Sequence, residues 1–249
     1  MANTDRTTAA KRVPEDSMKE KTMKVTPAGL SRSAGISAVV AGLLFVVIQP
    51  IHPHDTLASV TTNVWATIHY LTLAMALLFV VGTAGIYARQ VKEAGWLGLA
   101  GVLALSLGLL ITAAFVFVEA FIEPLLVSSS PEVVEGLLGI IGGHAPHTDL
   151  GALPAIYSIS GALFLGGCVL FGIATFRARV LPRWAAALFA FGVVVSAPVS
   201  AALQAPRLTA VPIGLGLAWL GYALWSERRK PAVAPLPETA TPQPDPAAA

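Results

Sequence analysis

The chain has 249 residues, of which 55% are hydrophobic and 12% are charged, and its net charge is +2. A soluble domain carries about twice that charged fraction, and apolar residues in long blocks are typical of helices surrounded by lipid. These values exclude a soluble globular protein, and so small a net charge gives no support for nucleic-acid binding beyond one short basic tail.

Both ends of the chain are polar. Residues 1–33 are rich in lysine and arginine and contain too little apolar bulk to fold alone, so we expect a disordered tail. The apolar run that follows has no small-residue cleavage site, which favours a retained helix over a signal peptide. Residues 227–249 are rich in proline and alanine and are also expected to be disordered.

Between the two tails, residues 34–226 form the predicted transmembrane domain. A helix of about 20 residues spans the hydrocarbon core of a bilayer, and six apolar segments meet or approach this length. They cover residues 34–50, 64–87, 96–123, 152–176, 183–203 and 208–226. The predicted fold class is therefore all-α, a polytopic transmembrane bundle of six helices.

The basic residues predict how these segments are oriented. Of the 16 lysines and arginines, only Arg207 falls outside the two tails and the turns at residues 88–95 and 177–183. Loops rich in lysine and arginine remain in the cytoplasm, so both ends of the chain are expected on the inner side of a bacterial plasma membrane. The lipid bilayer is then the first partner, and self-association into a homo-oligomer stays open.

Two stretches of the chain carry a resemblance. Residues 176–186 read FRARVLPRWAA, and residues 85–90 and 95–98 read GIYARQ and GWLG. Both stretches resemble the inner loops of small six-helix actinobacterial integral membrane proteins. Because no activity is known for those proteins, the resemblance implies a fold and a compartment but no chemistry.

All five histidines fall on the expected outer side. His52 and His54 lie in the first outer loop, and His144 and His147 lie in the second. Neutral imidazoles are ligands for Zn²⁺ and Cu²⁺, so the two pairs form a candidate metal site if the loops converge. The alternative is that these are ordinary solvated loop residues, because neither spacing is a known metal-binding motif.

Glu119 and His69 are the candidate catalytic residues. Counted along their helices at 1.5 Å per residue, both lie near the outer boundary of the hydrocarbon, so a contact between them is feasible. Ionisable groups at this depth usually face a partner or a cavity. The pair either exchanges a proton or acts only as a structural clamp, and Glu123, one helical turn further, is expected to be solvated.

The second outer loop contains a predicted short helix. Ser130, Pro131 and Glu132 supply a cap, a proline for the first helical position and an acid for the first turn. The apolar residues that follow indicate a helix lying on the outer surface. It either covers the histidines and acids as a lid or lies on lipid as an interfacial helix.

Three functions remain open from the sequence. The first, which we favour, is a component that binds or transports a small solute or an ion, since no nucleophile is evident. The second is a membrane enzyme with a metal or an acid–base pair at its outer face. The third is a non-catalytic sensor or scaffold whose basic tail is attracted to anionic lipids.

Overall fold

The structure is a computed structural model that describes residues 26–142, 148–202, 207 and 210–227. In these ranges every regular element is a helix and no strand occurs. The long helices are α1 (Pro27–Ile51), α3 (Asn63–Arg89), α4 (Val91–Phe117), α7 (Leu153–Ala178), α8 (Arg183–Ala202) and α9 (Ala210–Ser226). The short elements are α2 (Leu57–Val60), the π-helix η2 (Val118–Ile122), α5 (Glu123–Leu126) and α6 (Pro131–Gly142).

Four helices in the described ranges are long and apolar enough to cross a membrane. They are α1, α3, α7 and the continuous run Val91–Leu126, which joins α4, η2 and α5. The apolar parts of α8 and α9 in the same ranges are shorter. The all-helical prediction is therefore confirmed for the described residues, together with the long apolar helices of a membrane protein.

The first helix begins at Pro27 rather than at residue 34. The Thr26 hydroxyl accepts a hydrogen bond from the Gly29 N–H at 3.0 Å, and Pro27 occupies the first helical position. The helix therefore begins within residues 1–33, which were expected to form a disordered tail. Thr26 and Pro27 can start a helix even where polar residues follow them. Residues 1–25 lie outside the described ranges. Pro50, the last residue of the predicted segment 34–50, lies within the last turn of α1, which ends at Ile51.

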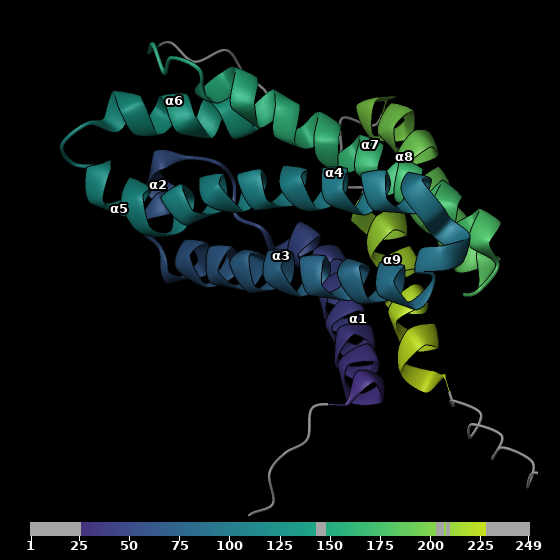
Figure 1. The fold of residues 1–249 in the computed structure, drawn as a ribbon. Coiled ribbons are helices and arrows are strands. Elements are labelled where there is room, and N and C mark those ends of the chain that lie inside the picture. Colours follow the sequence, from purple (N-terminus) through teal and green to yellow (C-terminus); the bar gives the residue numbers. More distant parts are fainter. Residues whose placement is uncertain (1–25, 143–147, 203–206, 208–209, 228–249) are drawn as a thin grey trace, which may run out of the picture.

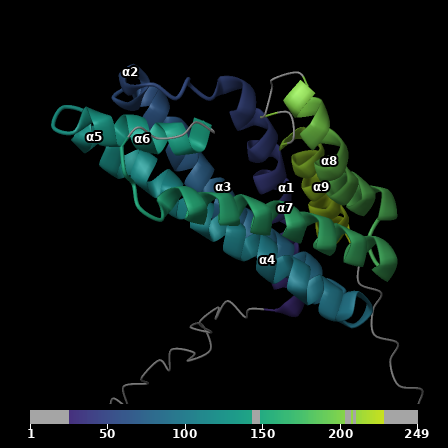
Figure 2. The ribbon, with the colours of Figure 1, turned by 90° about the horizontal axis from the view of Figure 1, so that it is seen from above.

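In the described chain the six long helices form a closed ring. Each contacts the next long helix along the chain, and α9 returns to contact α1. Figure 1 shows the start of α1 and the end of α9 side by side, and Figure 2 shows α4 and α7 running together along another side. Arg89 at the end of α3 donates from Nε to Glu227 at 2.7 Å, which joins α3 to the end of α9.

Phenylalanine side chains fill the middle of this ring. Phe79 of α3 is fully buried, and its ring centroid lies 5.9 Å from that of Phe45, 5.7 Å from that of Phe164 and 6.3 Å from that of Phe189. The first two contacts are edge-to-face, the arrangement that aromatic rings prefer. The described helices therefore enclose a packed core rather than an open channel.

Glycines allow two antiparallel helix pairs to approach closely. A Cβ atom on Gly42 of α1 would collide with the carbonyl oxygen of Gly214 on α9. A Cβ atom on Gly108 of α4 would collide with the backbone nitrogen of Phe164 on α7. Packing of this kind holds helices together in lipid, where the solvent is as apolar as the side chains.

Gly42→Ala should lower the stability of the protein, whereas Gly166→Ala should not. The methyl group at position 42 meets the backbone of α9, and such overpacking costs about 1–3 kcal/mol. Gly166 is also helical but has no atom within 4 Å of its Cβ position, so alanine there gains about 1 kcal/mol of helix propensity. Thermal unfolding in one detergent compares the two variants, and equal midpoints would contradict the close α1–α9 contact.

Candidate functional site

The short helices gather at one end of the ring, which we call the α6 end (Figure 1). Val134 and Leu138 of α6 pack on Val60 of α2 and Trp65 of α3 in a small separate apolar cluster. The predicted surface helix is therefore present, and it buries its apolar side against protein. This arrangement agrees with the lid alternative rather than with a helix that lies only on lipid.

The π-helix η2 leaves one backbone carbonyl free beside α3. The N–H of Glu123 bonds to the carbonyl of Val118, five residues back, as in other π-helices. Position 124 is a proline and has no N–H to offer to Glu119. The carbonyl oxygen of Glu119 instead accepts a hydrogen bond from Trp65 Nε1 at 2.8 Å. Pro124 and Trp65 together thus fix η2 against α3.

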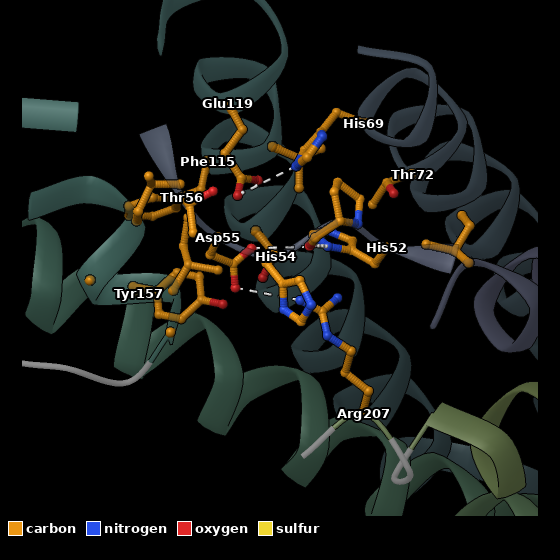
Figure 3. Close-up of a pocket in the computed structure, with 18 of the residues that line it drawn as sticks. His52, His54, Asp55, Thr56, His69, Thr72, Phe115, Glu119, Tyr157 and Arg207 are labelled. Carbon is orange, nitrogen blue, oxygen red and sulfur yellow. Dashed lines mark hydrogen bonds and ion pairs between the residues drawn. The ribbon is translucent and has the colours of Figure 1, made fainter. Parts of the chain in front are cut away.

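His69 and Glu119 lie together, as the sequence predicts (Figure 3). His69 Nε2 is 3.5 Å from Glu119 Oε1, and both side chains are buried. His69 Nδ1 is 2.7 Å from the carbonyl oxygen of Trp65, which can only accept, so Nδ1 carries a proton. In the neutral ring Nε2 is then a lone-pair acceptor. It has no hydrogen-bond partner, because 3.5 Å is too long for one.

Glu123 is buried, so the expectation of a solvated side chain is wrong. Neither of its carboxylate oxygens has a hydrogen-bond partner among the described residues. The chain beyond it folds back as α6, which contacts α5, the short helix that begins at Glu123. A sequence pattern within one helix does not reveal such contacts between elements. A buried carboxylate without a partner is costly, so Glu123 needs a proton or a nearby cation.

Asp55, which lies between α1 and α2, contacts Arg207, which lies between α8 and α9. Its Oδ2 atom is 3.4 Å from Arg207 Nη2, and its Oδ1 atom is 3.9 Å from His52 Nδ1. The centroid of the His52 ring is 5.2 Å from that of His69, so the two imidazoles touch. Burial lowers the pKa of His52 below its ordinary value, and the positive charge of Arg207 lowers it further.

These side chains line a cavity of about 1480 Å³. Figure 3 shows His52, His69, Glu119, Asp55 and Arg207 drawn around it. Its remaining wall includes apolar side chains from four of the long helices, Phe45, Met75, Leu109 and Phe164. A polar rim above an apolar wall is the usual composition of a site for a small organic molecule.

The predicted metal site is only partly described. His52 and His54 both line the cavity, whereas His144 and His147 lie outside the described residues. Within the described ranges, no three histidine, cysteine, aspartate or glutamate side chains are grouped to hold a metal ion. Binding of Zn²⁺ or Cu²⁺ by the four histidines therefore stays a prediction.

Trp65, Asp55 and Arg207 lie at the α6 end but are not among the site residues predicted from the sequence. Arg207 has a signal in the sequence, since it is the one basic residue placed outside the expected inner segments. Asp55 follows His54 directly, so the histidine motif already pointed to its loop. The role of Trp65 depends on the π-helix and on the missing N–H at position 124, and no periodicity of the sequence reveals it.

Trp65→Phe should lower the free energy of unfolding by about 1–3 kcal/mol, because it leaves the Glu119 carbonyl buried without a donor. Pro124→Ala restores a backbone N–H near this carbonyl, so Trp65→Phe should cost less in that background. Thermal unfolding of the wild type, both single variants and the double variant measures this coupling. Strictly additive losses would show that the two residues do not serve the same carbonyl.

The protein should lose stability as the pH falls below about 6.5, the ordinary histidine value. The unfolded chain then binds a proton at His52 that the folded protein resists, because the folded pKa is lowered. Above that pH neither state is protonated and the effect vanishes. Unfolding midpoints measured from pH 8 to pH 5 should decline less for His52→Gln than for the wild type. Identical declines would rule out a contribution from His52.

Comparison with known proteins assigns no role to these residues. No family model, no curated protein and no solved structure matches the chain. The chemistry of the α6 end is therefore inferred from its own contacts, charges and cavity.

Proposed function

We propose that the protein spans the bacterial plasma membrane six times, with both ends in the cytoplasm, and binds a small solute or ion in the cavity at its α6 end. The closed ring supports six spans, since α8 has 20 residues and α9 has 17. At 1.5 Å per residue these helices are about 30 and 26 Å long, close to the hydrocarbon thickness. The α6 end then faces the outside.

The cavity is the observation that carries this function. Its volume is about 1480 Å³, and side chains from α1, α3, α4 and α7 all contribute to its wall. Ionisable side chains at membrane depth are costly, so their concentration around one cavity indicates a ligand site. Structural packing alone would be served as well by apolar residues in these positions.

Binding is better supported than passage through the protein in this conformation. Phe45 and Phe164 line the cavity and also contact Phe79 in the middle of the ring. A transported solute would require these rings to separate, whereas a solute that only binds would not. The function is therefore a binding component, and transport needs a second conformation in which the phenylalanines part.

A membrane enzyme is the second candidate. One observation favours it, namely that Glu119 and His69 place a buried acid and a buried base side by side at the cavity wall. In such a pair, one group can donate a proton to a bound molecule while the other accepts one. Chemical change of a bound probe, followed by mass spectrometry, would distinguish this candidate from simple binding.

Ala113→Cys should react with a membrane-impermeant thiol reagent added outside intact cells. Ala113 lines the cavity and is partly exposed, so a thiol there should be reached from the outer solution. The wild type is the control, because its one cysteine, Cys168, is fully buried. Labelling measured by a mass shift should appear only in the variant. Reaction only after the membrane is broken would contradict the proposed orientation and the outward-facing site.

A further inference from the structure

The α6 end has a surplus of buried acceptors. In the described part of the chain, buried side-chain atoms without a hydrogen-bond partner are Asp55 Oδ1, His69 Nε2, both oxygens of Glu123 and Gln90 Oε1. All of these except Gln90 lie at the α6 end, and two of them, Asp55 Oδ1 and His69 Nε2, belong to residues that line the cavity. Both of these atoms are acceptors when the aspartate is ionised and the imidazole is neutral. Buried polar atoms are normally paired, so this set calls for donors that the described residues do not supply.

We propose that the cavity binds an organic ammonium ion with a compact apolar body, whose N–H groups donate to the Glu119 carboxylate and to His69 Nε2. This inference rests on the proposed function and specifies the class of solute. An ammonium group supplies both a positive charge and several N–H donors, which is the combination that the unpaired acceptors require.

The charges around the pair favour a cation. With the histidines neutral, the cavity wall carries the carboxylates of Asp55, Glu119, Glu132 and Glu135 and one basic group, Arg207. Glu123 and the Tyr157 hydroxyl of α7 lie within electrostatic range of Glu119 and Asp55. A cavity with this surplus of acids concentrates cations and repels anions.

The spacing of Glu119 and His69 suits a donor nitrogen that lies beside both side chains. Their facing atoms are 3.5 Å apart, too far for a direct hydrogen bond but close enough for one N–H group to reach each from a common nitrogen. Thr72 and Thr112 add to this pattern, because each hydroxyl donates to a backbone carbonyl of its own helix. Both threonines line the cavity, and the Thr112 oxygen also lies 3.2 Å from Ser160 Oγ.

The apolar wall favours an organic cation over the simplest cations. Phe45, Met75 and Phe164 would remain in contact with water if a bare metal ion or a short polyamine occupied the site. Burying an apolar body against these side chains adds free energy of binding in proportion to its area. The described residues also provide no group of three metal ligands.

Four probes with the same apolar body test the proposal. Adamantylamine has N–H donors and a positive charge, whereas adamantanol is neutral and adamantane carboxylate is an anion. Trimethyladamantylammonium keeps the positive charge but has no N–H. Binding is measured by calorimetry on the full-length protein in lipid nanodiscs, with empty nanodiscs subtracted. The amine should bind at least about tenfold more tightly than each of the other three, since a charge-assisted hydrogen bond contributes that much.

Two variants locate the bound amine. Glu119→Gln should weaken adamantylamine binding by about ten- to a hundredfold and should leave adamantanol binding nearly unchanged. Glu93→Gln, at an exposed acid near the opposite end of α4, is the matched control and should change neither. If Glu119→Gln does not fold, Asp55→Asn replaces it and should weaken only the two cationic probes.

The outcomes separate the two proposals. Equal or tighter binding of the alcohol or the carboxylate would overturn the ammonium assignment while leaving a small-solute site in place. No binding of the amine would also overturn it, and labelling of Ala113→Cys from outside then decides whether the cavity is an outward-facing site at all. Amine binding that survives Glu119→Gln unchanged would place the ligand elsewhere and contradict the proposed contacts.

Discussion

The hydrogen bond from the Trp65 indole to the Glu119 carbonyl oxygen is the contact on which the α6 end depends. It exists because η2 shifts the hydrogen bond of Glu123 to Val118 and because proline follows at position 124. The same turn of chain sets the direction of the Glu119 side chain, and the Trp65 backbone carbonyl sets the tautomer of His69. One tryptophan thus orients both members of the buried pair.

The closed ring of helices supports this site by a different kind of force. In lipid there is no hydrophobic driving force between apolar helices. The ring is therefore held by close backbone contacts at glycines such as Gly42 and Gly108. The phenylalanines at its centre fill the space that the ring encloses and form the inner limit of the cavity. The packed phenylalanines in the middle of the ring and the ionisable groups at the α6 end are consistent with a binding site supported by a rigid core.

The long helices could be predicted from the sequence because runs of about 20 apolar residues are typical of helices that cross a bilayer. A contact between His69 and Glu119 was feasible from the sequence, since helix rise places both near the outer boundary of the hydrocarbon. The start of α1 was missed because Thr26 and Pro27 precede polar residues. Burial of Glu123 was missed because it depends on contacts between elements, which a pattern within one helix does not show. Contacts such as Asp55 with Arg207 join loops far apart in the chain, and spacing carries no information about them.

The order of contacts in the ring bears on how the protein is made. Each long helix meets its neighbour in the chain as soon as both have been synthesised, but α1 receives α9 only when the last helix emerges. Protein synthesis adds about 5–20 residues per second, so the glycine face of α1 stays without its partner α9 for roughly 10–30 seconds. Until then the nascent protein is an open arc with two complementary edges. Two such arcs on neighbouring ribosomes could close on each other, so ring closure competes with exchange between chains during biogenesis.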